Sequence, residues 1–434
     1  MLSRIGALTA KISADVIAHR RDFHKHAETG WTEFRTASLI ARQLDRLGLE
    51  VHAGRSVIVD DVRMGVPAPE VLDAAWQRAK AQGGDPAYLE KTRGGFTGVV
   101  GLLGGGEGPT VGLRFDIDAL DLQESQAEDH RPAREGFASI NEGAAHACGH
   151  DGHAALGLGV AGVLSGLADA LRGRVKLIFQ PAEEGVRGAK AMVAAGVVDD
   201  VDVMVGLHVH TGWPTGVVTT GRGGFLATDK LDAIFTGEAA HAGGSPQRGK
   251  NALLAAATAA LNLHALPRHR DGVTRINVGR LVAGEGRNVI PPTAYMAIET
   301  RGGTLELAAY MREAARRVLE SAAAMYGCSL EVVSMGSAGT AESDPALATR
   351  VAEVVERLPE LSVRPEQPSG GSEDFTYMMQ RVQQRGGLAT SLNFGADGEG
   401  GGAHTATFDF DERALPLAVK LLAALVLDVQ ARPL

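Results

Sequence analysis

Three short apolar runs, each followed by a polar turn, constrain the fold of this chain more than any other feature. They are Val111–Phe115, Val175–Phe179 and Val203–Leu207, and an Ala- and Leu-rich stretch of helical length, from about Ala154 to Leu171, separates the first two. Strands that alternate with helices predict an α/β fold, with a mixed but mainly parallel sheet flanked by helices. Because ligands of such sheets bind at the carboxyl ends of strands, the three turns are the first place to expect a site.

The pattern changes from about Phe225 to Ser334, where the predicted order becomes strand, helix, strand, strand, helix, strand. This order is typical of a ferredoxin-like α+β domain. The α/β pattern then resumes, so we predict a discontinuous catalytic domain of residues 1–224 and 335–434, with residues 225–334 inserted in it. Residues 66–95 leave two interpretations open: a surface insertion with one helix, or a wall of a substrate pocket.

Charge and cysteine content exclude several classes of protein. A net charge of −9 gives no electrostatic footprint for nucleic acid or an anionic membrane. Two cysteines form no disulfide framework and suit a reducing compartment. The first residues predict an amphipathic helix rather than a signal peptide, and no apolar run approaches the roughly 20 residues of a membrane span. We therefore expect a cytoplasmic protein.

The densest chemistry lies in residues 146–153, which hold three histidines, a cysteine and an aspartate. A lone histidine or cysteine is usually structural, but this density favours a metal site. If the segment is extended, Cys148 and His150 point the same way and can reach one centre, because side chains alternate with period two.

Acidic and imidazole side chains from three other stretches complete a candidate metal centre. Glu183 and Glu184 follow the second strand, where one can be a ligand and the other a general base. His208 ends the third strand and His404 lies in a glycine-rich loop. Five ligands suffice for two divalent cations if one ligand bridges, and zinc or manganese both fit this set. The candidate ligands are Cys148, His150, Glu184, His208 and His404.

Four motifs together resemble the M20 metallopeptidase family, in its aminoacyl-amidohydrolase branch, over nearly the whole chain. They are HACGHDGH at 146–153, QPAEEG at 180–185, AHAG at 240–243 and GGSED at 370–374. The resemblance implies a Zn-peptidase-like fold with a pair of divalent metal ions, Mn²⁺ or Zn²⁺, held by the five candidate ligands. It also implies that Glu183 is the general base and that the inserted domain acts as a lid and dimerises.

The resemblance assigns further residues to the inserted domain. His241 matches the histidine that stabilises the oxyanion, while Asn288 and Arg301 match positions that hold the substrate carboxylate. Arginine suits this role because its planar fork bonds a carboxylate through two hydrogen bonds. Where other branches of the family carry a histidine and a bridging aspartate, this chain has Asp116, Asp118 and Cys148. We assign Asp118 to the orientation of a ligand.

The resemblance also implies the activity: hydrolysis of a small N-acyl amino acid, with p-aminobenzoyl-glutamate as the leading substrate and indole-acetyl-aspartate as the alternative. The expected partner is a second copy of the chain or a related subunit. Two rival interpretations stay open at this point. One is a thiol hydrolase that uses Cys148, which resistance to chelators would reveal. The other is a non-catalytic partner subunit, against which the full ligand set argues.

Overall fold

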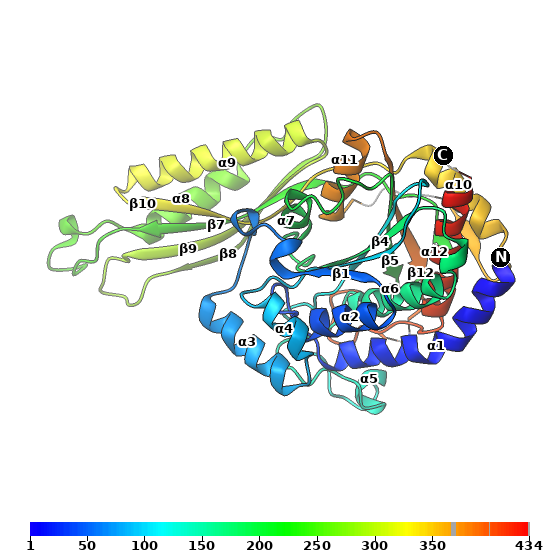
Figure 1. Cartoon of the computed structure of the whole chain (residues 1–434). Helices are drawn as coiled ribbons and strands as arrows, with labels where there is room; N and C mark the ends of the chain where they lie inside the picture. Colours follow the sequence, from blue (N-terminus) through cyan, green and yellow to red (C-terminus); the bar gives the residue numbers. More distant parts are fainter. Residues whose placement is uncertain (366–369, 399, 433–434) are drawn as a thin grey trace. The chain divides into compact units, whose positions relative to one another are not determined.

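A computed structural model describes residues 1–365, 370–398 and 400–432 (Figure 1). The chain divides into two compact units. The first comprises Met1–Gly223, Ala341–Ser369 and Asp374–Leu434, and the second comprises Gly224–Thr340 and Gly370–Glu373.

The first unit is built on an eight-stranded sheet whose central strands run parallel. The three apolar runs form β3, β4 and β5, and β12 pairs in parallel with β5. Strand β2 pairs antiparallel with both β4 and β1, and β11 pairs in parallel with β6. The predicted mainly parallel sheet is thus confirmed. In spatial order the strands are β1 (Glu50–Ala53), β2 (Val99–Gly104), β4 (Arg174–Gln180), β3 (Val111–Asp116), β5 (Val203–His210), β12 (Leu388–Gly395), β6 (Val217–Thr219) and β11 (Ser362–Arg364).

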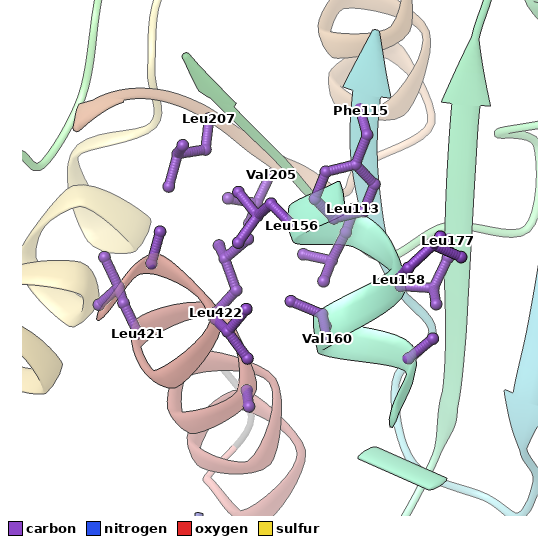
Figure 2. Close-up of a cluster of buried hydrophobic side chains, with 14 of the residues drawn as sticks. Leu113, Phe115, Leu156, Leu158, Val160, Leu177, Val205, Leu207, Leu421 and Leu422 are labelled. Carbon is purple, nitrogen blue, oxygen red and sulfur yellow. The ribbon is translucent and has the colours of Figure 1, made fainter. Parts of the chain in front are cut away.

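Helices cover both faces of this sheet because its central strands are apolar on both sides. Leu177 and Phe179 of β4 point into one core, where α1, α6 and α12 pack, while Ile178 points into a second core that includes Phe375 of α11. Figure 2 shows the first core, with Leu156 and Leu422 meeting side chains of the strands. The helices are α1 (Leu2–Lys25), α2 (Phe34–Arg46), α3 (Pro69–Ala81), α4 (Pro86–Thr92), α5 (Arg131–Arg134), α6 (His150–Ser165), α7 (Ala189–Ala194), α10 (Pro345–Glu356), α11 (Phe375–Gln384) and α12 (Ala414–Ala431). Short 3₁₀ turns occupy Gly54–Ser56, Asp60–Val62 and Ala168–Ala170.

The segment 66–95 differs from the sequence expectation of a single helix. It forms two helices, α3 and α4, which pack against α2. Leu72, Trp76 and Leu89 are buried and join the second core. Each of these helices begins with a proline, which favours the first position of a helix. Pro86 begins α4 at a place where the sequence indicated only a break at Gly83 and Gly84.

Among the described residues, one helix meets the length and composition of a membrane span. It is α12, with a mean hydropathy of 1.8, but 72% of its window is buried inside the protein. Such burial is typical of the core helix of a globular unit.

The second unit has a four-stranded antiparallel sheet in the order β10-β7-β9-β8, with the predicted sequence of elements. Helices α8 and α9 pack on it around a core that includes Phe235 and Met311. The elements are β7 (Ala227–Thr236), α8 (Ala252–His264), β8 (Thr274–Ala283), β9 (Thr293–Gly302), α9 (Leu305–Met325) and β10 (Ser329–Ala338), with a 3₁₀ turn at Pro246–Arg248. A role of this unit as a lid or dimerisation domain stays a prediction.

Candidate metal centre

The carboxyl ends of β3, β4 and β5 lie at one edge of the first unit's sheet. Asp116, the last residue of β3, pairs in register with Gln180, the last residue of β4. His208 lies near the end of β5, next to β3 in the sheet. The polar turns that follow these strands therefore meet at a common edge, as in other α/β sheets.

The five candidate ligands come together at this edge. Cys148, His150 and Glu184 place one donor atom each within 4.8 Å of one another. Sγ of Cys148 lies 3.6 Å from Nε2 of His208. Nε2 of His404 lies 3.7 Å from Oε1 of Glu184. Four distant stretches of sequence thus supply one thiol, three imidazoles and one carboxylate to a single cluster.

Cys148 and His150 reach the cluster by a route other than the extended segment expected from sequence. Gly149 has a φ of +89° and precedes α6, so His150 is the first residue of a helix. The left-handed glycine turns the chain sharply between the two ligands, a conformation that residues with a side chain rarely adopt. The expectation of an extended segment is wrong, because the chain bends at Gly149.

Backbone carbonyls select the tautomers of two histidines. Nδ1 of His150 donates to the carbonyl of Asp118 at 2.9 Å, and Nδ1 of His208 donates to the carbonyl of Val209 at 2.7 Å. The lone pair of each ring is then on Nε2, the atom that faces the cluster. A hydrogen bond at one ring nitrogen commonly orients a metal-binding histidine in this way.

The electrostatics of the cluster favour a bound cation. Burial lowers the pKa of His150, but Asp116, Asp118 and Cys148 together outweigh burial and raise that pKa well above its usual value. Positive charge is therefore favoured at His150, whose buried Nε2 has no hydrogen-bond partner within the described part of the chain. Burial also raises the pKa of the Cys148 thiol to about 12. The donor set fits a late first-row divalent cation, which would convert this thiol into a thiolate ligand.

Asp118 connects two of the candidate ligands. Its backbone carbonyl accepts the hydrogen bond from His150, and its Oδ2 accepts one from the backbone N–H of Glu184 at 2.8 Å. The side chain is buried at 1% exposure. Its contacts are those of a residue that orients ligands.

Glu183 lies at the edge of the cluster, on a tightly wound turn. Its Oε2 is 3.9 Å from Nε2 of His150. Ala182 and Val186, on either side of the acidic pair, have positive φ angles of 51° and 60°. A β-branched residue in this region is a conformational outlier, and such strain is concentrated at functional sites.

A buried carboxyl group that the sequence reasoning missed supports this turn. Glu33 accepts hydrogen bonds from the N–H of Ala182 at 2.8 Å and from the hydroxyl of Thr97 at 2.6 Å. Burial, with a further contribution from Asp118, raises the pKa of Glu33 to about 8. No local signal distinguishes Glu33, because it precedes an ordinary amphipathic helix.

Asp116 and His153 form a second group that sequence reasoning left without a role. The N–H of Val209 donates to Nε2 of His153 at 2.9 Å, so the proton of this ring is on Nδ1 and is donated to Asp116. Asp116 also accepts from Arg114 at 2.5 Å. Both nitrogens of His153 are therefore engaged, and this ring braces β5 against α6. The spacing of His150 and His153, three apart on one helix, was the available signal.

The three remaining predicted residues all belong to the second unit. The N–H groups of Gly243 and Gly244 donate to Nδ1 of His241 at 3.1 and 2.9 Å, which leaves the proton of this exposed ring on Nε2. Asn288 is adjacent, since its carbonyl accepts from Ala242 at 2.9 Å. Arg301 on β9 pairs with Glu299 at 3.0 Å. Their participation at the metal centre stays a prediction.

An α/β sheet that gathers a thiol, imidazoles and carboxylates at its strand ends, interrupted by an α+β unit, is the architecture of a metallohydrolase. Residues 112–428 match Peptidase family M20/M25/M40. The chain belongs to this family of metallopeptidases and amidohydrolases, which confirms the predicted family and enzyme class.

Several relatives match this chain over almost its full length. Indole-3-acetyl-aspartic acid hydrolase of Enterobacter agglomerans is 51% identical over 94% of each chain. One of the subunits of p-aminobenzoyl-glutamate hydrolase from Escherichia coli is 48% identical over 94% of each chain. A crystal structure of an aminobenzoyl-glutamate utilization protein from Klebsiella pneumoniae has a TM-score of 0.85 at 44% identity and covers 98% of both chains. A dinuclear metal-binding M20 peptidase of Bacillus subtilis has a TM-score of 0.67 at 26% identity, over 97% of this chain and 99% of that chain.

Proposed function

We propose that this chain is a two-metal amidohydrolase of N-acyl amino acids, and that p-aminobenzoyl-glutamate is its substrate. The observation that carries the proposal is the convergence of five donor side chains beside Glu183, a carboxylate outside that ligand set. Relatives that act on this compound and on indole-acetyl-aspartate support both the leading substrate and its alternative.

Cys148, His150, Glu184, His208 and His404 would hold the two divalent cations, which would supply polarisation of the scissile carbonyl and a lowered pKa of the attacking water. Glu183 accepts the proton of the attacking water and later delivers it to the leaving nitrogen.

The second unit would contribute the remaining groups. His241 has its ring proton on Nε2, the donor that an oxyanion requires. Asn288 and Arg301 would hold the carboxylate of the amino acid. Arg301 would have to exchange its ion pair with Glu299 for the substrate, which a half-exposed pair permits at small cost.

The buried environment of Cys148 disfavours the thiol-hydrolase alternative. A nucleophilic cysteine needs a lowered pKa, whereas burial raises that of Cys148 to about 12. Loss of turnover on treatment with a chelator, and its recovery on adding zinc or manganese, would exclude this alternative and identify the metal.

We further propose a cytoplasmic protein that pairs with a second M20 chain, either a copy of itself or a related subunit. The edge strand β8 supports pairing, because Leu281 and Val282 on it are exposed, as is Leu261 of α8 at 76%. Light scattering on the purified chain distinguishes self-association from a need for another subunit.

The deciding experiment replaces Glu183 by Gln, which keeps its size and removes its basicity. We expect hydrolysis of p-aminobenzoyl-glutamate to fall by at least about 100-fold while metal content, measured by mass spectrometry, is unchanged. Glu50→Gln, at an exposed site on β1, is the matched control. Retained turnover in Glu183→Gln would refute the assignment. A wild-type chain that binds metal without hydrolysing either conjugate would indicate the non-catalytic subunit.

A further inference from the structure

Arg187 lies immediately after the turn that carries Glu183 and Glu184, and its side chain folds back over that turn. Its Nε donates to the carbonyl of Glu184 at 2.8 Å, and its Nη1 donates to the carbonyl of Gly65 at 3.1 Å. Both acceptors are neutral peptide groups. Across residues 1–365, 370–398 and 400–432, Arg187 makes no ion pair with a carboxylate. Both N–H groups of Nη2 and one of Nη1 are left for another acceptor.

Two buried arginines of the first unit, by contrast, form ion pairs with carboxylates. Arg20 has three carboxylates within 3.2 Å, and Arg114 faces Asp116 at 2.5 Å. Arg187 is half-buried and lacks such a partner. Removing a charge from water without compensation is costly, so an uncompensated cation beside a reaction centre indicates an anionic ligand.

A glycine makes room for this guanidinium. Gly30 does not have a positive φ, so its backbone conformation does not require glycine. A Cβ there would nevertheless collide with Nη2 of Arg187 and approach Cα of Ala182 to 3.2 Å. The preceding residue, Thr29, bridges to Ala119, next to Asp118. The guanidinium thus occupies a notch formed by Gly30, Gly65 and the 182–185 turn, directly beside the candidate metal centre.

We infer that Arg187 binds the side-chain carboxylate of the substrate's amino acid and selects acidic conjugates over neutral ones. The inference rests on the proposed function and names a determinant of its substrate class. Glutamate and aspartate conjugates each carry two carboxylates, and Asn288 with Arg301 account for only one of them. The outer edge of the Arg187 fork, with one N–H of Nη1 and one of Nη2, can receive the other through two parallel hydrogen bonds.

The test compares two substrates that differ only in this charge, p-aminobenzoyl-glutamate and p-aminobenzoyl-glutamine. We expect the wild-type kcat/KM to favour glutamate. Arg187→Met should reduce that preference by roughly 10- to 100-fold, the usual effect of one charge-assisted hydrogen-bonded pair, almost entirely by slowing the glutamate conjugate. Arg187→Lys should restore part of the preference because it keeps the charge. Lys190→Met, which removes an exposed cation three residues further on, should leave it unchanged.

A purely structural role predicts another result. If Arg187 only connects the turn to the carbonyl of Gly65, Arg187→Met slows hydrolysis of both conjugates by the same factor. An unchanged ratio of the two kcat/KM values therefore overturns the inference. Calorimetric binding of free L-glutamate and L-glutamine to the wild type and to Arg187→Lys needs neither turnover nor a stable methionine variant. Equal binding of the two amino acids by the wild type also overturns the inference. Failure of the wild type to hydrolyse either conjugate counts against the proposed function. Even then, tighter binding of L-glutamate than of L-glutamine by the wild type, with a smaller difference in Arg187→Lys, supports the role of Arg187.

Discussion

Replacing Arg20 by methionine should destabilise the first unit substantially. Arg20 lies on α1 and is fully buried. Its nitrogens are 2.7 Å from Asp151, 2.9 Å from Asp409 and 3.2 Å from Glu412. These carboxylates come from the first turn of α6 and from the segment before α12, so one guanidinium holds three parts of the chain together. Methionine retains most of the length and apolar stem while removing the charge.

The size of the loss in unfolding free energy depends on which cations remain beside the three carboxylates once Arg20 is removed. Breaking a buried ion pair by removing one partner costs about 3–5 kcal/mol. In Arg20→Met, however, Asp409 keeps Arg131 at 2.8 Å, Glu412 keeps Arg21 at 2.6 Å, and Asp151 keeps His24 at 2.8 Å. We therefore expect a loss of about 3 kcal/mol, at the lower end of that range.

Urea unfolding at pH 7, followed by tryptophan fluorescence, measures this loss in the relevant unit. The chain has 3 tryptophans, Trp31, Trp76 and Trp213, and all belong to the first unit. Arg4→Met is the matched control, because Arg4 forms an exposed, solvent-screened pair with Asp169 and its loss should leave the free energy of unfolding nearly unchanged. A loss below about 1 kcal/mol in Arg20→Met would show that the buried network does not depend on this arginine.

Four further outcomes follow from the structure. Burial raises the pKa of Asp409 and Glu412, but their interactions with Arg131, Arg21 and Arg20 together outweigh burial and lower it. The contribution of the two carboxylates to stability is therefore full above about pH 4 and is lost as the pH falls below it; urea midpoints that stay constant down to pH 3 would contradict this. A chelator should lower the thermal midpoint, and added divalent metal should restore it; an unchanged midpoint would argue against a bound metal. Gly157→Ala should cost about 1–3 kcal/mol, because its Cβ would lie 2.5 Å from the ring of Phe179, and equal stability would mean that the ring moves freely. Leu422→Ala, in the core of Figure 2, should lower the free energy of unfolding by about 2–5 kcal/mol; a loss below about 1 kcal/mol would mean that the site collapses around the smaller residue.

The central part of the fold was accessible from sequence because buried parallel strands have a simple signature. The runs that form β3, β4 and β5 are apolar on both faces. Short apolar runs that alternate with helices are typical of parallel strands buried on both faces of a sheet. The strands β1, β6 and β11 have only 3 or 4 residues each and were missed. Their pairing depends on neighbours distant in sequence, which no local pattern reports.

The chemistry of the ligands was also visible in the sequence, whereas their support was not. Cysteine, histidine and paired glutamates are unusual enough to be noticed wherever they occur. Glu33 is an ordinary residue locally, and only the folded chain brings Glu33 to the N–H of Ala182 and Asp116 to His153. In the sequence, Arg114 is a charge that interrupts an apolar strand. In the structure it donates hydrogen bonds to Asp116 and Gln180.

Peptide groups orient the candidate metal centre as much as side chains do, so its geometry depends on the packing of whole elements. The carbonyl of Asp118 orients His150, the N–H of His404 donates to the carbonyl of Ala147 at 2.7 Å, and the N–H of Glu184 binds Asp118. These peptide groups lie in the segments that follow β3 and β4, in the loop of His404 and just before α6. Asp151, which Arg20 holds, is in that first turn of α6, one residue from His150. Arg20→Met should therefore weaken metal binding by about 10- to 100-fold although Arg20 touches no ligand, and the second, unchanged unit should show no matching loss of stability. Equilibrium dialysis with zinc or manganese, at a urea concentration where the variant is still folded, measures this coupling; an unchanged affinity would mean that the start of α6 is held by the sheet alone.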